Sequence, residues 1–135
     1  KRGSTMRHRI LFVDDEVNIL KALQRSLRGK RTEWEMVFEQ SGQAALDRLE
    51  TESFDVIVSD MRMPELDGPA LMKQVRHQYP AMGRIILSGY SDDETMVRTG
   101  DAAQCYLDKP CDANLLVETI HSLLDKDGRT DSSSQ

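Results

Sequence analysis

The sequence predicts an α/β protein built on a doubly wound, five-stranded parallel sheet of (βα)5 type. Short apolar runs alternate with segments of helical periodicity, and this pattern occurs five times along the chain. Most of the runs are continuously apolar, which is typical of parallel strands buried on both faces. With 135 residues, 39% hydrophobic and 30% charged, the chain is long enough for one domain with a substantial core.

Three strands are predicted in the first half of the chain. They are residues 9–13, 34–39 and 54–59. Helical spacing of apolar residues predicts two helices between them, over residues 16–29 and 42–51. Gly29 supplies an end for the first helix, and Ser41 is placed to cap the second.

The second half continues the alternation with two more strands and three helices. The strands are residues 84–88 and 104–107, and the helices are about residues 67–79, 92–99 and 112–124. Asp67 and Pro69 mark a helix start, and Pro80 marks its end. The strand 104–107 is more polar than the others, as expected at the edge of a sheet. The last helix is expected to bury an apolar face made of Leu115, Leu116, Ile120, Leu123 and Leu124.

One folded domain is predicted over residues 7–126. Residues 1–6 are expected to be a tag remnant or disordered arm, and residues 127–135 a polar tail or truncated linker. The net charge of −5 argues against direct nucleic-acid binding by this domain. No apolar run approaches the roughly 18 residues of a membrane span, so no membrane contact is expected. Cys105 and Cys111 match no zinc or redox spacing, which favours a reduced, cytoplasmic protein.

Four basic residues interrupt the acidic balance: Arg25, Arg28, Lys30 and Arg31. They fall at the end of the predicted helix 16–29, where the helix dipole favours cations. The cluster is therefore interpreted as a solvated helix end and not as a binding site.

Polar residues end or follow four of the five strands, at the edge where open parallel sheets bind ligands. Asp14 and Asp15 follow the first strand and Asp60 the third, while Ser88 ends the fourth and Lys109 follows the fifth. Each residue alone is more often a turn residue or a helix cap. The prediction of a functional site depends on all five converging.

Three converging carboxylates repel one another unless cations are present. Lys109 would offset one charge and a divalent cation the other two. Oxygen ligands favour a hard ion, with Mg²⁺ first and Mn²⁺ or Ca²⁺ as alternatives. A carboxylate beside such an ion and an ammonium is suited to attack phosphorus. Asp60 is therefore predicted to be a nucleophile that forms an aspartyl phosphate.

Taken together, the motifs resemble the receiver domain of bacterial two-component response regulators over about residues 9–124. The matching pieces are Val13-Asp14-Asp15-Glu16, Asp60-Met61-Arg62-Met63-Pro64 with Gly68, Leu87-Ser88-Gly89, Tyr106 and Lys109-Pro110. The resemblance implies a CheY-like form of the flavodoxin-like fold.

The resemblance also implies roles at the metal and phosphoryl positions. Asp60 would be the phosphorylation site, and Lys109 would contact the phosphoryl group. Asp15 and Asp60 would bind Mg²⁺ directly, Asp14 would help through water, and the backbone carbonyl of Arg62 would be a further ligand. Mn²⁺ would be able to replace Mg²⁺.

Three more positions would control the switched state. Ser88 would be the switch hydroxyl and Tyr106 the switch aromatic. Arg62 and Tyr90 occupy the positions that tune the lifetime of the phosphorylated state in the family. Both are bulky, which suggests that they shield the aspartyl phosphate from water.

The expected partners also follow from the resemblance. The phosphoryl donor would be a sensor histidine kinase or a phosphotransfer protein, and the chain would control an output domain or partner. The runs around Ser88 and Tyr106 are similar to receivers joined to HD-GYP or HDOD output domains. A homodimer is a further family expectation. The domain would not be an enzyme beyond catalysing its own phosphoryl transfer and dephosphorylation.

Three alternatives stay open from the residues alone. A small phosphotransferase or phosphatase of the haloacid-dehalogenase type would place an Asp-x-Asp pair after the first strand, where Asp14-Asp15 stands. A pseudo-receiver would bind proteins without phosphorylation, although every key residue is present. A nucleotide-binding domain would need a glycine-rich phosphate loop, and the sequence has none after the first strand.

Overall fold

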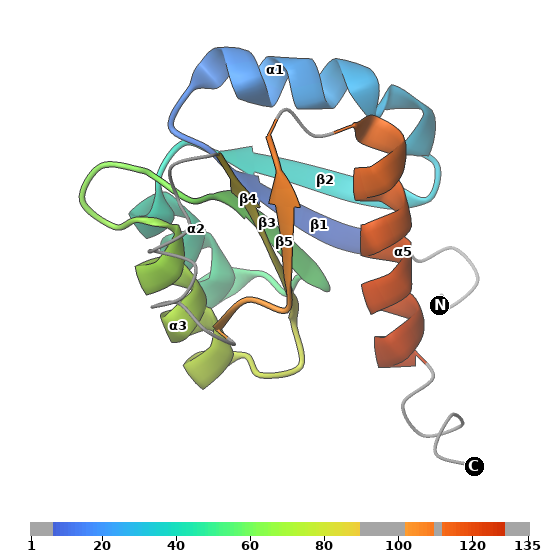
Figure 1. The fold of residues 1–135 in the computed structure, drawn as a ribbon. Coiled ribbons are helices and arrows are strands. Elements are labelled where there is room, and N and C mark those ends of the chain that lie inside the picture. Colours follow the sequence, from blue (N-terminus) through green and yellow to red (C-terminus); the bar gives the residue numbers. More distant parts are fainter. Residues whose placement is uncertain (1–6, 90–101, 110–111, 129–135) are drawn as a thin grey trace.

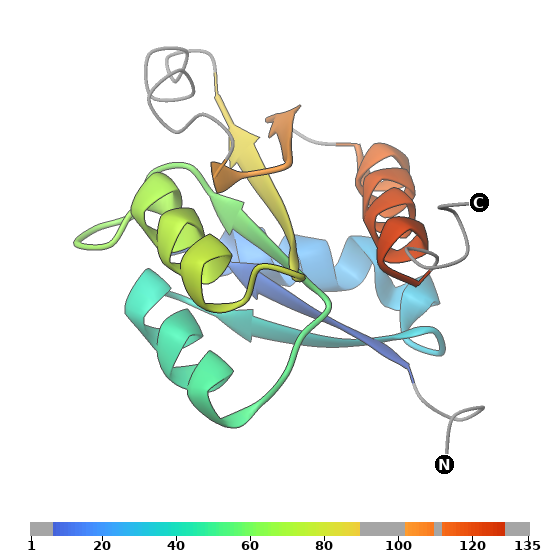
Figure 2. The same ribbon diagram turned by 90° about the horizontal axis from the view of Figure 1, so that it is seen from below.

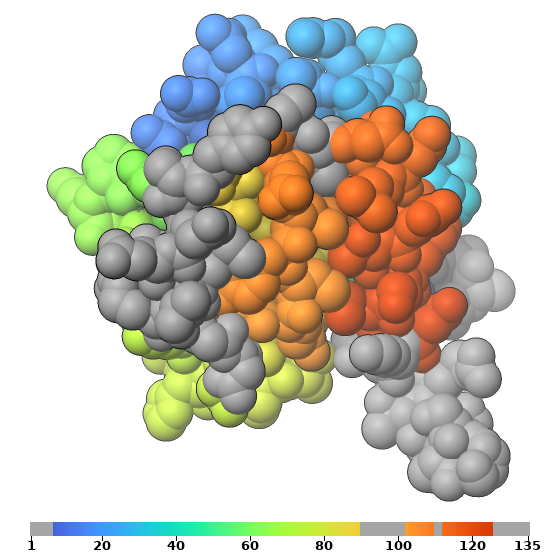
Figure 3. Space-filling model, in the orientation of Figure 1, coloured from blue at the N-terminus to red at the C-terminus, as the bar shows by residue number. Residues whose placement is uncertain are grey.

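In the computed structural model, which describes residues 7–89, 102–109 and 112–128, five parallel strands form one sheet (Figure 1). The strands are β1 (His8–Val13), β2 (Trp34–Glu39), β3 (Val56–Asp60), β4 (Gly83–Ser88) and β5 (Cys105–Asp108). Their order is β2-β1-β3-β4-β5, which places β3 in the centre and β5 at an edge. The predicted fold class is therefore confirmed. In the space-filling view of Figure 3, β5 and α5 (Ala113–Gly128) lie next to each other on the surface.

Helices cover both faces of the sheet (Figures 1 and 2). One face carries α1 (Val17–Ser26) and α5, and the other carries α2 (Gly42–Thr51) and α3 (Gly68–Gln78). The predicted helix 92–99 lies outside the described residues. Within the described segments, no helix combines the length and the apolar character that crossing a bilayer requires.

The strands bury side chains on both faces, which explains their continuous apolar character. On β3, Ile57 packs in the cluster beneath α2 and α3, whereas Val56 and Val58 pack in the cluster beneath α1 and α5. On β1, Leu11 packs in the cluster beneath α2 and α3, and Phe12 packs in the cluster beneath α1 and α5. Each such residue contributes about 1.5–3 kcal/mol when it is fully buried. The central strands are thereby fixed in register, and their carboxyl ends meet at one edge.

Local capping sets the starts of α2 and α3 where the sequence predicts them. The Ser41 hydroxyl accepts a hydrogen bond from the Ala44 amide at 3.0 Å, and the Asp67 carboxylate accepts one from the Ala70 amide at 3.0 Å. Both side chains satisfy an amide that would otherwise lack a partner in the first turn. The observed bounds of α2 equal the predicted range 42–51.

The predicted helix 16–29 is shorter in the structure. Helix α1 ends at Ser26, and a separate 3-10 helix, η2, spans Arg28–Lys30. Leu27 leaves helical geometry, with φ −102° and ψ 12°, and its side chain is buried. The helix therefore ends before Gly29, with the buried Leu27 at the junction between α1 and η2.

The predicted apolar face of α5 is wrong at one residue, Leu115. Leu116, Ile120, Leu123 and Leu124 are buried, but Leu115 is 46% exposed. The buried residues follow the i, i+4, i+7, i+8 spacing of one helix face, and position 115 lies off that face. Helix α5 ends at Gly128 and includes the first two residues assigned to the tail.

Candidate functional site

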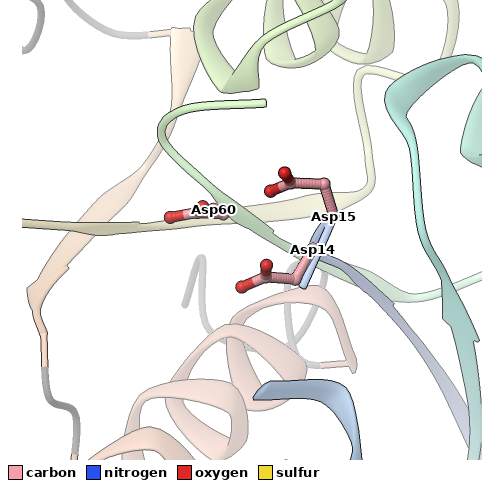
Figure 4. Close-up of side chains that lie close together, drawn as sticks. All are labelled: Asp14, Asp15 and Asp60. Atoms are coloured by element: carbon pink, nitrogen blue, oxygen red, sulfur yellow. The ribbon is translucent and has the colours of Figure 1, made fainter. Parts of the chain in front are cut away.

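Three carboxylates converge at the carboxyl ends of β1 and β3, as the sequence predicts (Figure 4). The two strands pair in parallel with Val13 opposite Ser59, so the following residues, Asp14 and Asp60, reach the same edge. One oxygen atom from each of Asp14, Asp15 and Asp60 lies within 4.8 Å of the others. Within the described residues, this is the group of acidic side chains that matches the spacing of a metal site.

The ammonium of Lys109 joins the acidic cluster. Its Nζ donates a hydrogen bond to Asp60 Oδ1 at 2.8 Å, and the Met61 amide donates to the same oxygen at 2.9 Å. The Lys109 amide donates to the Ser88 carbonyl at 2.8 Å, which holds the residue beside the end of β4. Burial acts to lower the pKa of Lys109, but its hydrogen bond to Asp60 and the charges of Asp60 and Asp14 raise it above the ordinary value. The lysine is therefore a fixed cation at the site.

Asp14 is a buried carboxylate with one oxygen that has no hydrogen-bond partner among the described residues. The side chain is 2% exposed, and its Oδ1 accepts a hydrogen bond from the Glu16 amide at 2.9 Å. Its Oδ2 is buried and, within the described part of the chain, has no hydrogen-bond partner. Burial raises the pKa of Asp14 to about 6, and the neighbouring charge of Asp60 adds to the rise. A cation at this position would supply the missing partner, so the residues present fit a divalent metal ion.

The structure places the other predicted residues as follows. Ser88 ends β4 and is 1% exposed, directly after Leu87, which pairs with Asp60. Tyr106 lies on β5 opposite Ile86 and packs, partly buried, against the cluster beneath α2 and α3. Arg62 is exposed. Tyr90 and Pro110 lie outside the described residues.

Gly68 has a structural role that the sequence did not reveal. A Cβ atom at this position would lie closer to the Asp60 carbonyl oxygen than real Cβ atoms approach, and 3.0 Å from the Met61 Cα. The Gly68 amide donates to the Met61 carbonyl at 2.9 Å. The start of α3 therefore packs directly against the backbone of the acidic site. The Asp-Gly-Pro motif indicated only a helix start.

The fold and the site together define a class, the CheY-like α/β domains that carry an acidic pocket and a lysine at the carboxyl edge of a five-stranded parallel sheet. The chain belongs to the response regulator receiver domain family, whose family model matches residues 10–121. It is thus a receiver domain of the two-component response regulators, which is a signalling domain.

Curated relatives and solved structures agree with this assignment. The chain is 36% identical to the transcriptional regulatory protein ZraR of Escherichia coli K12 over 118 residues, which cover 85% of this chain and 26% of ZraR. It is 38% identical to the DNA-binding transcriptional regulator NtrC of Klebsiella pneumoniae over 110 residues, which cover 81% of this chain and 23% of NtrC. The chain thus spans about a quarter of the length of these relatives.

Two solved structures share the fold closely. The CheY-like receiver domain protein of Methanospirillum hungatei JF-1 superposes with a TM-score of 0.85 at 28% identity, covering 93% of this chain and 99% of that one. The signal receiver domain of an HD domain-containing protein from Pseudomonas fluorescens Pf-5 gives a TM-score of 0.82 at 29% identity, covering 91% and 98%.

Proposed function

We propose that Asp60 is the phosphoryl acceptor of this receiver domain and that its phosphorylation switches the domain. The observation that carries the proposal is the contact of Asp60 Oδ1 with Lys109 Nζ at 2.8 Å inside a group of three carboxylates. Of the three, Asp60 is the one that both ends the central strand and holds the lysine. Asp14 is more deeply buried, and Asp15 is exposed.

The proposed reaction transfers the phosphoryl group from a phosphohistidine to a carboxylate. An Asp60 oxygen forms a bond to phosphorus while the P–N bond breaks, and the electron pair leaves with the imidazole nitrogen, which takes up a proton. Lys109 neutralises charge on the phosphoryl oxygens, and the Met61 amide holds Asp60 Oδ1 in place. The chain thereby catalyses its own modification without turning over a free substrate.

The proposed cofactor is Mg²⁺, with Mn²⁺ as a substitute. Asp15, Asp60 and the backbone carbonyl of Arg62 would bind it directly, and Asp14 would help to hold it through water. When bound, the ion supplies charge neutralisation at the phosphoryl oxygens. Asp14 Oδ2, which has no hydrogen-bond partner among the described residues, supports this assignment, because a buried carboxylate oxygen needs a cation or a donor.

The proposed switch involves Ser88 and Tyr106. A phosphoryl group adds about −1.5 to −2 charge and new acceptor oxygens next to the end of β4. The Ser88 hydroxyl would move to donate to one of these oxygens, and Tyr106 on the neighbouring β5 would then rotate inward. Arg62, exposed beside the site, and Tyr90 would shield the aspartyl phosphate from water and lengthen its lifetime.

The proposed partners are a sensor histidine kinase, or a phosphotransfer protein, as donor and an output domain as receiver of the signal, in the bacterial cytoplasm. Two outputs each have support among the neighbours. The relatives ZraR and NtrC are transcriptional regulators, and a structural neighbour is the receiver of an HD domain-containing protein. We retain the HD-GYP or HDOD type as a candidate output and a homodimer as a candidate assembly. The sequence of the complete gene would test which type of output domain, if any, accompanies the receiver domain.

The decisive experiment is phosphorylation in vitro. Incubation with Mg²⁺ and acetyl phosphate should add one phosphoryl group, observed by intact-protein mass spectrometry, and peptide mapping should place it on Asp60. Asp60→Asn should abolish the modification, whereas Asp47→Asn, which changes an exposed aspartate of α2, should leave it intact. A wild-type protein that accepts no phosphoryl group from any donor would favour the pseudo-receiver alternative. Steady release of phosphate from small phosphoesters would favour the phosphotransferase.

A further inference from the structure

A second charged region lies away from the phosphorylation site, between the end of α1 and the edge strand β2. It is an open cavity of about 490 Å³. Four arginines line it, Arg7, Arg25, Arg28 and Arg31, together with side chains of β2. We call this region the arginine cleft. It concentrates positive charge on a chain whose net charge is −5.

Within the part of the chain that the structure describes, three of these guanidinium groups have no acidic partner. Within the described residues, no hydrogen bond or ion pair engages the side chains of Arg25, Arg28 and Arg31, and all three are exposed. Arg7 donates to the Arg31 carbonyl at 2.6 Å, which links two of the lining arginines. The acidic residue of the lining, Glu35, is already paired with Arg9 at 3.3 Å. The cleft therefore presents unneutralised donors.

Arginines elsewhere in the domain behave differently. Arg48 pairs with Glu39 and with Glu52, and Arg9 pairs with Glu35 and Glu52. The helix dipole explains the position of Arg25, in the last turn of α1, but not Arg28 and Arg31, which lie beyond its end. A solvated helix end is thus an incomplete explanation for the cluster.

The floor of the cleft is apolar and is formed by alternate residues of strand β2. Met36 and Phe38 of β2 are partly buried and alternate with Glu35 and Val37. The Phe38 ring stacks on Phe12 with centroids 4.9 Å apart, which fixes it in place. Among the described strands, β2 pairs only with β1, and it forms an edge of the sheet. An extended segment lying along such an edge places alternate side chains over alternate floor residues.

We propose that the arginine cleft binds an acidic, extended peptide segment of a partner protein. Carboxylates of the segment would accept bidentate hydrogen bonds from Arg25, Arg28 and Arg31, and apolar side chains between them would contact Met36 and Phe38. A long nucleic acid fits less well, because the net charge of −5 repels an extended polyanion beyond the cleft. A small inorganic anion would bind the arginines but would make no contact with the apolar floor formed by Met36 and Phe38.

The test uses a fluorescein-labelled peptide, Glu-Val-Asp-Phe-Glu-Val-Asp, titrated with the unphosphorylated full chain and followed by anisotropy. Binding should saturate, and the fluorescence of Trp34, the single tryptophan, which lines the cleft, should change. Amide shifts in ¹⁵N-correlation spectra should concentrate on β2 and the end of α1. The matching peptide with Lys in place of each acid should not bind.

Matched double variants separate the cleft from overall charge. Arg25→Glu with Arg28→Glu should weaken peptide binding about tenfold or more, because charge-assisted hydrogen bonds are replaced by repulsion. Lys21→Glu with Lys73→Glu changes the net charge equally at exposed positions outside the cleft and should change binding less than about twofold. Circular dichroism checks that both variants fold.

Three results would overturn the proposal. They are a lack of saturable peptide binding, equal weakening by the two double variants, and tighter binding of ATP or of a ten-nucleotide oligothymidylate than of the peptide. Because the assay uses unphosphorylated protein and residues far in sequence from Asp60, its failure leaves the phosphorylation of Asp60 unaffected.

Discussion

The acidic site and the arginine cleft both gather charges of one sign, but they do so in different surroundings. Asp14 and Asp60 are 2% and 9% exposed, whereas Arg25, Arg28 and Arg31 are exposed. Burial makes the repulsion of the carboxylates costly and raises the pKa of Asp14, while water screens the arginines. A cation at the acidic site therefore favours the ionised form of Asp14, whereas the exposed arginines need no ligand to remain charged. Mutations in the acidic site should affect phosphorylation and stability, whereas mutations in the arginine cleft should affect only peptide binding.

Removal of the fixed cation should have the largest effect. Lys109→Met takes away the ammonium that contacts Asp60 Oδ1. We expect the rate of phosphorylation by acetyl phosphate to fall about 100-fold or more, because preorganised charge at the transferred group is lost. Time courses by mass spectrometry at constant Mg²⁺ measure the rate. Lys73→Met, at an exposed position on α3, is the control, and an unchanged rate in Lys109→Met would remove the lysine from the chemistry.

The raised pKa of Asp14 predicts a pH-dependent stability in the metal-free protein. The folded state keeps the Asp14 proton up to a pKa of about 6, and the unfolded chain loses it at a pKa of about 4. Between these values the folded state binds more protons, so the free energy of unfolding decreases as pH rises. The contribution of Asp14 should fall by about 2–3 kcal/mol from pH 4 to pH 7.

Urea unfolding in EDTA at a series of pH values measures this dependence. Asp14→Asn cannot titrate at this position, so the difference between wild type and variant isolates the contribution of Asp14. Addition of Mg²⁺ at neutral pH should stabilise the wild type by mass action, since the ion binds only the folded site. An identical pH dependence in the two proteins would show that Asp14 ionises normally.

Substitution of Gly68 should disturb the acidic site through the backbone. The Cβ of Gly68→Ala would clash with the Asp60 carbonyl oxygen and press on the Met61 Cα. We expect a loss of about 2 kcal/mol in the free energy of unfolding, because backbone atoms cannot move aside as a flexible side chain does. Gly29→Ala is the matched control, since no atom of the described residues lies within 4 Å of its Cβ, and it should be neutral or slightly stabilising.

Much of the fold and the acidic site follows from the sequence, for a simple reason. Strands buried on both faces are continuously apolar, and parallel strands bring residues that follow them to one edge. Asp14 and Asp60 could therefore be placed together from their positions alone, and the register of β1 with β3 agrees. The sequence could not tell which carboxylate is buried, because Asp14 is enclosed by packing and held by the Glu16 amide, whereas Asp15 is exposed.

The arginine cleft illustrates the limit of sequence patterns. The sequence groups Arg25, Arg28 and Arg31 but gives no sign that Arg7 joins them. That contact needs β1 and the end of η2 to lie side by side, which results from strand pairing between β1 and β2. The pattern likewise placed Leu115 in the buried face of α5, because adjacent leucines do not reveal where a helix face ends.

The smallest effect should follow from removing one guanidinium of the arginine cleft. Arg28→Ala should change the free energy of unfolding by no more than about 0.5 kcal/mol, because the side chain is exposed and forms no ion pair with the described residues. Arg9→Ala is the matched comparison and should cost about 1–2 kcal/mol. It removes ion pairs to Glu35 and Glu52 and a guanidinium that lies 4.5 Å from the centre of the Phe54 ring.

Urea unfolding of the two variants under the same conditions measures this difference. Equal losses would mean that Arg28 contributes to the fold as Arg9 does, and the contrast between a buried, cation-dependent site and a cleft kept open for binding would fail. We expect Arg28→Ala to leave the free energy of unfolding nearly unchanged, because the cleft is exposed. Charged side chains that do not stabilise the fold remain available to bind a partner.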